Sequence, residues 1–270
     1  GRLLDARIAE DQQWRFVPVA ELPDKYEQAL LLFEDKRFYR HPGIDPLAIA
    51  RAMRLNLEAG RVVSGGSTLT MQLARLLRDD PPRTLIEKAR EALVALQLEW
   101  HFSKPEILAQ YASHAPFGGN IVGLRAAAWR YFGRQPGALS WAEAALLAVL
   151  PNSPSLIHPG RNRERLLAKR NALLQQLHRQ GAMAEADLRL ALMEPLPAAP
   201  RPLPGLAPHL LNTLSKTSPR RLLTTTLDAD LQRRVQELAR QHGRRLARYG
   251  VHNVAVVVID HQQRQTRAYV

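Results

Sequence analysis

Six prolines fall within the fourteen residues PLPAAPRPLPGLAP, at positions 195–208. Proline has a fixed φ and no backbone N–H, so neither a helix nor a central strand can run through such a segment. The sequence therefore predicts that residues 195–208 are extended and partly polyproline II, within a linker over residues 195–220. This linker separates a domain over residues 1–194 from a second domain that begins at residues 221–270.

The segment before the linker has helical periodicity over most of its length. Apolar residues recur every three to four positions, as they do on the buried side of an amphipathic helix. A strand or an extended lead-in is expected over 14–19. We therefore expect a mainly α domain with helices over 22–34, 46–60, from Ser67 or Thr68 to about 78, and over 84–100, 105–112, 124–133, 140–150, 161–180 and 184–193.

Two helix starts carry capping signals. Thr84 is followed three residues later by Glu87, and Ser140 by Glu143. Each pair predicts a capping box, in which both side chains bond backbone N–H groups of the first turn. The helix that begins at Thr84 follows a break at DDPPR, residues 79–83. It is expected to bury an apolar face made of Leu85, Ala89, Ala92, Leu93 and Leu96.

The segment after the linker mixes strand and helix patterns. RLLTTTLD, at residues 221–228, predicts a strand, and a helix is expected over 228–247. VAVVVIDHQQRQTRAYV predicts a hairpin with strands at 254–259 and up to Val270. One helix and one hairpin bury little apolar surface alone, so we expect an incomplete α+β domain here.

The formal net charge is +13, from 38 basic and 25 acidic residues. A basic balance indicates an anionic partner, such as nucleic acid, an anionic lipid surface or a phosphorylated substrate. Nucleic acid is the least favoured, because aromatic residues make up only 6% of the chain and do not alternate with cations. The absence of cysteine excludes disulfides, Cys–zinc sites and a Cys nucleophile.

The longest apolar run, AALLAVL at residues 144–150, is far shorter than the ~20 residues that a membrane-spanning helix needs. The chain opens on GRLLDAR, without an initiator Met or a signal-peptide pattern. We expect it to be a fragment, with room for a membrane anchor upstream.

The stretch EDKRFYRHPGID, residues 34–45, places charged and aromatic side chains directly after an apolar helix. Glu34 and Asp35 stand at the helix C-terminus, where the macrodipole disfavours carboxylates. One interpretation is a solvated helix end, compensated by the nearby Lys and Arg residues. The other is a site for acid–base chemistry, and the spacing alone does not decide between them.

Two further stretches suit an anion. SGGSTLTMQ, residues 64–72, places hydroxyl and free N–H groups at a helix start, where they can hold phosphate oxygens. The alternative is an ordinary capped turn.

On the next helix, Lys88 and Glu91 share a face, and Arg75 and Arg83 precede them. A carboxylate among cations suits a diphosphate, with or without a divalent metal, and a surface ion pair is the alternative. The histidines lack zinc-ligand spacing.

Taken in order, these stretches resemble the five motifs of the peptidoglycan glycosyltransferase domain of class A penicillin-binding proteins, also called glycosyltransferase family 51. EDKRFYRHPGID fills every fixed position of motif one, E-D-x-x-F-x-x-H-x-G-x-D, and GGSTLTMQLAR is similar to motif two, G-x-S-T-x-T-Q-Q. EKARE resembles motif three, R-K-x-x-E, KPEILAQYAS with FGG resembles motif four, and RNALL resembles motif five. Within the family, ALQLEWHFSKPEIL, APFGG and LAVLPNSPS are most similar to the 1C type.

Three residues depart from the family pattern. Met71 replaces the first Gln of motif two, Glu87 replaces the Arg of motif three, and Ser113 stands where motif four has Asn. None removes a family carboxylate, but Glu87 removes one cation from the diphosphate region.

The resemblance implies a lysozyme-like fold with a small, membrane-facing jaw subdomain. It implies polymerisation of lipid II into glycan strands by inverting transfer, with release of undecaprenyl diphosphate. The catalytic residues would be Glu34, as general base, and Glu91, which would orient the cations or hold a divalent cation, Mg²⁺ or Mn²⁺. The implied substrate-binding residues are Asp35, Phe38, Arg51, Ser67, Thr68, Gln72, Arg75, Arg83, Lys88 and Arg90.

The resemblance also implies partners and a location. The partners would be lipid II, the growing glycan strand, the membrane surface and other cell-wall synthesis proteins, with no nucleic acid. The location would be periplasmic, at the outer face of the bacterial cytoplasmic membrane, with an N-terminal anchoring helix that is missing from this chain. Residues 221–270 resemble the start of a transpeptidase domain, but the chain has no S-x-x-K, so no transpeptidase activity is expected.

Two other functions stay open on the sequence. A lysozyme or lytic transglycosylase also uses a lone Glu on an α scaffold, but it needs no cation cluster around a second carboxylate. A non-catalytic module that binds lipid II or peptidoglycan would tolerate the three departures.

Overall fold

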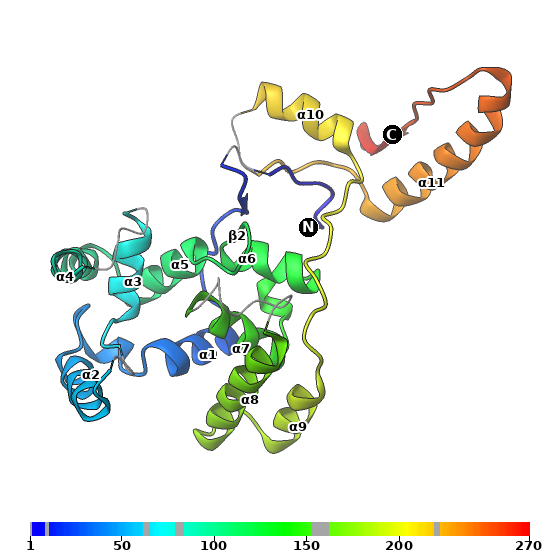
Figure 1. Cartoon of the computed structure of the whole chain (residues 1–270). Helices are drawn as coiled ribbons and strands as arrows, with labels where there is room; N and C mark the ends of the chain where they lie inside the picture. The colour runs from blue at the N-terminus through cyan, green and yellow to red at the C-terminus, as the bar shows by residue number, and fades with distance from the viewer. Residues whose placement is uncertain (1, 9–10, 62–64, 79–83, 153–161, 219–221) are drawn as a thin grey trace. The chain divides into compact units, whose positions relative to one another are not determined.

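The computed structural model describes residues 2–8, 11–61, 65–78, 84–152, 162–218 and 222–270, and the chain divides into two compact units (Figure 1). The larger unit is Ala9–Arg201, and the smaller one comprises Gly1–Ile8 with Pro202–Val270. Helices predominate over strands among the described residues. The mainly α fold class is therefore confirmed.

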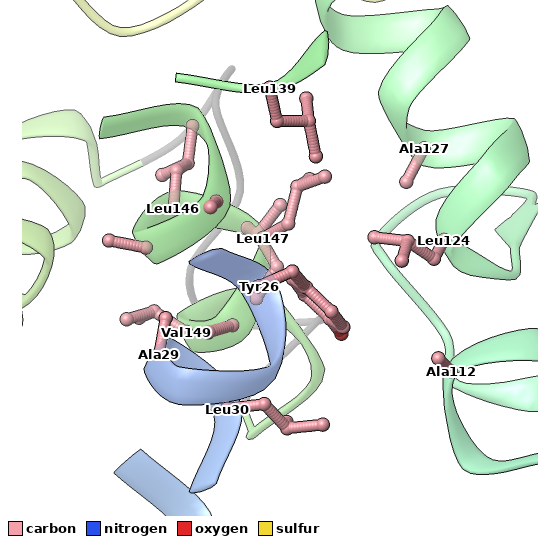
Figure 2. Close-up of a cluster of buried hydrophobic side chains, with 14 of the residues drawn as sticks. Tyr26, Ala29, Leu30, Ala112, Leu124, Ala127, Leu139, Leu146, Leu147 and Val149 are labelled. Atoms are coloured by element: carbon pink, nitrogen blue, oxygen red, sulfur yellow. The ribbon is translucent and has the colours of Figure 1, made fainter. Parts of the chain in front are cut away.

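The core of the larger unit is built around α7, Trp141–Val149, which is buried at every position after its first. A helix that is apolar on all sides belongs in a core, and the run AALLAVL accounts for this one. Helices α1, Asp24–Glu34, and α8, Arg163–Arg179, pack against it. Figure 2 shows the α1 and α7 side chains together, with the ring of Tyr26 beside Leu147.

A second group of helices carries most of the sequence motifs. Helix α3, Leu69–Leu76, packs against both α4, Leu85–His101, and α5, Lys104–His114. Figure 1 shows α3 between the other two. Because α3 begins with motif two, its position brings that motif next to the helices of motifs three and four.

The predicted apolar face of α4 is wrong. Leu93 is 64% exposed and Leu96 is 40% exposed, whereas Glu91 and Ala95 are buried. The helix has this rotation because Glu91 and Glu99 form ion pairs with cations on α3 and α5. The buried face of α4 is therefore the one that carries Glu91 and Glu99, and Leu93 and Leu96 are left on the exposed side.

The predicted capping box at the start of α4 forms only in part. The Thr84 hydroxyl accepts a hydrogen bond from the Glu87 N–H at 3.1 Å, as predicted. The Glu87 carboxylate pairs with two arginines instead of returning a bond to Thr84. The DDPPR segment at 79–83 and the side chain of Leu85 lie outside the described residues.

The other elements of the larger unit largely follow the predictions. The capping box at Ser140 and Glu143 is complete. The helix predicted over 124–133 is divided into a short α-helix and a π-helical turn that ends at Gly133, where φ is +71°. Strands β1 and β2 pair in parallel through two residues each. These elements are β1 (Trp14–Arg15), η1 (Phe38–Arg40), α2 (Pro46–Ala59), β2 (Ile121–Val122), α6 (Leu124–Ala127), η2 (Ala128–Phe132), η3 (Pro136–Ala138), η4 (Leu150–Asn152) and α9 (Glu185–Met193).

The smaller unit departs from the prediction in two places. Within the predicted linker over 195–220, helix α10, Pro208–Thr217, forms because Pro208 stands in the first turn and no proline follows it within the helix. The predicted strand at 221–228 does not form in its described part; Asp228 instead caps helix α11, Ala229–Leu246. The unit ends with η5 (Ala247–Tyr249), β3 (Val257–Asp260) and β4 (Gln265–Tyr269), the last two as the predicted hairpin.

Among the described residues, no helix is both long enough and apolar enough to span a membrane.

Candidate active site

Glu34 is the last residue of α1 and is half-buried. The Gln72 side-chain amide on α3 donates a hydrogen bond from Nε2 to Glu34 Oε2 at 2.9 Å. The Tyr111 hydroxyl on α5 donates to Oε1 of the same amide at 3.3 Å. One carboxylate is therefore linked to motifs two and four, and its side chain does not point freely into water.

Asp35 is buried rather than solvated, with 7% of its surface exposed. Its Oδ2 accepts a hydrogen bond from the Leu69 N–H at 3.0 Å, in the first turn of α3, and lies 3.0 Å from His41 Nε2. A carboxylate is favourable at a helix N-terminus because the macrodipole is positive there. Asp35 thus fastens the end of α1 to the start of α3, and this fixes the backbone next to Glu34.

Thr68 is the N-cap of α3, as one of the two predicted caps. Its hydroxyl accepts from the Met71 N–H at 3.1 Å and donates to the Gly43 carbonyl at 2.6 Å. Gly43 has φ of +93°, and a Cβ there would lie 2.9 Å from the Ala95 carbonyl oxygen. This contact leaves no room for a larger residue, so the end of motif one is held between α3 and α4.

Phe38 is fully buried beneath a cation that the sequence analysis did not single out. Lys104 Nζ lies 4.3 Å from the centre of the Phe38 ring. The same ammonium donates to the His41 carbonyl at 2.6 Å and to Glu99 Oε1 at 2.8 Å. Glu99 also accepts a hydrogen bond from the Thr70 hydroxyl, so the loop of motif one is joined to both α4 and α5.

Several of the predicted phosphate-binding residues come together where α3 meets α4. Arg75 Nε lies 3.9 Å from Glu91 Oε1, and both side chains are largely buried. Lys88 Nζ donates a hydrogen bond to the Ser67 hydroxyl. Lys88 and Glu91 lie one helical turn apart, so the two links place two cations, a hydroxyl and a carboxylate along one contact between helices.

Glu87 forms a separate group with two arginines. Its carboxylate lies 2.6 Å from Arg90 Nη1 and 2.7 Å from Arg78 Nη2. The hydrogen bond from Arg90, and then the bond and charge of Arg78, hold the pKa of Glu87 below its usual value. Arg90, predicted to bind substrate, is therefore paired with the residue that replaces the family arginine.

Two predicted residues are not placed in this cluster. Arg51 is exposed on α2. Arg83 lies outside the described residues.

The described residues contain no group of three or more His, Asp or Glu side chains close enough to hold a metal ion by themselves. Glu91 supplies one carboxylate, with Arg75 as its neighbour. One carboxylate can hold Mg²⁺ only if the remaining ligands come from substrate phosphate and water, which is a common arrangement for this ion.

Lys104, Glu99 and Tyr111 are the site residues that the sequence analysis missed. Lys104 and Tyr111 stand at the two ends of KPEILAQYA, two helical turns apart, so they share the face of α5 that meets α3. This spacing was a signal for both residues. Glu99 carried no comparable signal, because its role depends on the rotation of α4.

Comparisons with known proteins agree with the motifs. A family model described as transglycosylase matches residues 1–178. The chain is 45% identical over 261 residues to penicillin-binding protein 1C of Escherichia coli K12, covering 96% of this chain and 34% of that protein. It is 40% identical over 181 residues to penicillin-binding protein 1A of Aquifex aeolicus, covering 67% and 25%. The chain belongs to the transglycosylase family, and the resemblance to class A penicillin-binding proteins is confirmed.

The chain spans about a third of the length of the Escherichia coli relative. A crystal structure of penicillin-binding protein 1A from Haemophilus influenzae aligns with 63% of this chain and 24% of that one, at 21% identity and a TM-score of 0.32. That score is too low to establish a shared arrangement.

Proposed function

We propose that this chain is a peptidoglycan glycosyltransferase that polymerises lipid II, with Glu34 as the general base. The observation that carries the proposal is the Glu34 carboxylate, held by Gln72 beside the helix pair that contains Arg75 and Lys88. A carboxylate base next to cations suits transfer from a diphosphate better than it suits glycan cleavage. We further propose the lysozyme-like arrangement with a jaw subdomain, and a periplasmic location at the membrane surface, from the same family membership.

The reaction forms one glycosidic bond and breaks one bond to phosphate. Glu34 takes the proton from the 4-hydroxyl of the acceptor sugar, and the hydroxyl oxygen attacks the anomeric carbon of the growing chain from the opposite face. The bond from that carbon to the lipid diphosphate breaks, and the diphosphate leaves with the electron pair. The configuration is inverted, and the growing strand is transferred to the new lipid II.

The leaving diphosphate gains negative charge in the transition state. Arg75 and Lys88 would bind it, since preorganised cations stabilise charge that develops during the reaction. Ser67, Thr68 and Gln72 would line the donor pocket, and Asp35 and Phe38 would support Glu34. Arg51, Arg83 and Arg90 stay proposed contacts of the diphosphate or of the anionic membrane surface.

The assay for this proposal follows labelled lipid II with the 270-residue chain in detergent. We expect glycan strands and free undecaprenyl diphosphate. Shortening of preformed glycan with no polymer would favour a lytic enzyme. Binding of lipid II without any turnover would favour a non-catalytic module.

Glu91 is proposed to hold a divalent cation together with the substrate diphosphate. A bound Mg²⁺ or Mn²⁺ would neutralise phosphate oxygens of the leaving group. We expect EDTA to reduce the polymerisation rate severalfold and added Mg²⁺ to restore it. The Glu91→Gln variant should be slow and insensitive to EDTA; an EDTA response equal to that of the unchanged chain would remove Glu91 from this role.

Glu87 should weaken donor binding, because it occupies two arginines near the cation cluster. We expect Glu87→Gln to lower the KM for lipid II about two- to threefold at low ionic strength, with kcat unchanged, and the difference to vanish in high salt. The KM is measured at several salt concentrations. Glu185→Gln is the control, since it makes the same charge change at an exposed pair with Arg189 on α9. A higher KM in Glu87→Gln would mean that Glu87 aids binding.

A further inference from the structure

Three polar side chains from three helices form a chain that ends on the proposed base. Tyr111 Oη donates to Gln72 Oε1 at 3.3 Å, and Gln72 Nε2 donates to Glu34 Oε2 at 2.9 Å. Gln72 and Glu34 are half-buried, whereas Tyr111 is only 1% exposed. A substrate can therefore reach the carboxylate and not the phenol.

The two hydrogen bonds together fix the Gln72 amide. An amide offers an oxygen on one side and an NH₂ group on the other. If it turned over, its oxygen would face the Glu34 carboxylate, and two acceptors would repel each other. In the observed orientation the amide oxygen accepts a hydrogen bond from the Tyr111 hydroxyl, and this bond stabilises that orientation.

We propose that Tyr111 is a positioning residue, which acts through Gln72 to hold the Glu34 carboxylate towards the acceptor hydroxyl. This inference rests on the proposed function, since it matters only if Glu34 removes a proton. A general base must lie within hydrogen-bonding reach of the proton it takes, so loss of the Gln72 orientation costs rate more than binding.

Burial keeps the phenol in the donor form that this role requires. Burial, and then the negative charge of Glu34, raise the pKa of Tyr111 well above its usual value. The hydroxyl is therefore protonated at neutral pH. The chain of donors runs in one direction, from Tyr111 to Gln72 to Glu34.

A second buried tyrosine, Tyr26 on the same helix as Glu34, provides a matched control. Burial and the charge of Glu34 also raise the pKa of Tyr26. Its ring lies within the core cluster (Figure 2), and its hydroxyl has no hydrogen-bond partner among the described residues. Tyr26 shares with Tyr111 its burial and the influence of the Glu34 charge, but it is not part of the chain of donors.

The test compares Tyr111→Phe with Tyr26→Phe in the 270-residue chain. We expect kcat for lipid II polymerisation to fall about tenfold in Tyr111→Phe, with the KM within about twofold, because the interaction acts mainly in the transition state. The acidic limb of the pH–rate profile should move to higher pH, because a carboxylate that loses a donor is less stable when ionised. Tyr26→Phe should keep the kcat and the pH profile of the unchanged chain.

A double-substitution experiment tests whether Tyr111 acts through Gln72. In a Gln72→Ala background, Tyr111→Phe should cause no further loss of kcat. Tyr131→Phe controls for stability, since it removes a buried hydroxyl that bonds the Phe117 carbonyl at 2.9 Å.

The inference is overturned if Tyr111→Phe matches the unchanged chain, or if it loses the same factor with and without Gln72. It is also overturned if Tyr131→Phe shows the same change in pH profile. If Glu34→Gln retains activity, Glu34 is not the base, and the part of the proposed function on which this inference rests fails. If Glu34→Gln is inactive and Tyr111→Phe is normal, the positioning role alone fails.

Discussion

Replacement of Glu34 by Gln should reduce lipid II polymerisation by about a thousandfold, within the range that general base catalysis contributes. The amide cannot take the proton of the acceptor hydroxyl. It has nearly the same shape as the carboxylate, and its oxygen can still accept the hydrogen bond from Gln72. The variant should therefore fold and bind lipid II while failing to extend strands, as gel separation of labelled products and a separate binding assay would measure.

Glu27→Gln is the matched control for this variant. Glu27 stands on the same helix, α1, and accepts a hydrogen bond from the Tyr39 hydroxyl at 2.5 Å instead of a bond from Gln72. Its replacement should leave polymerisation at the normal rate. If Glu34→Gln polymerises as fast as the control, the base lies elsewhere, and Glu91→Gln becomes the next variant to measure.

The sequence predicted the elements that carry the site better than the contacts between them. Helix α1 and a cap at Ser67 or Thr68 were predicted because both follow from local rules, an apolar period and a hydroxyl before the first turn; the structure has the cap at Thr68. The rotation of α4 was not, because Glu91 and Glu99 face inward towards cations on other helices. A period of apolar residues carries no information about where such a cation will lie.

The same limit explains the residues that were missed. Lys104 and Tyr111 contact Phe38 and Gln72, which lie more than 35 residues earlier in the chain. Only the packing of α3 against α5 brings them together. The resemblance to the family motifs supplied the candidates at the site, whereas the physical reason for Asp35, a bond to the first turn of α3, needed the structure.

Replacement of Asp35 by Ala should have the largest effect on stability. It removes a buried acceptor and leaves the Leu69 N–H and His41 without their partner. Loss of one partner from such a buried network costs roughly 2–4 kcal/mol in the free energy of unfolding. For a unit of this size the Tm should fall by about 5–15 °C, as calorimetry would measure.

The activity of this variant should fall together with its stability, because Asp35 fixes the backbone at Glu34. A misplacement of about 1 Å costs roughly a hundredfold in rate, so we expect a loss of that size at temperatures where the variant is folded. Asp228→Ala is the control: Asp228 also accepts two backbone N–H groups, at the start of α11 in the smaller unit. It should lower the Tm less and leave polymerisation intact.

Asp35→Asn keeps one acceptor oxygen, so its Tm and its rate should lie between those of Asp35→Ala and of the unchanged chain. If Asp35→Ala keeps its Tm and its rate, the link from α1 to α3 does not position Glu34.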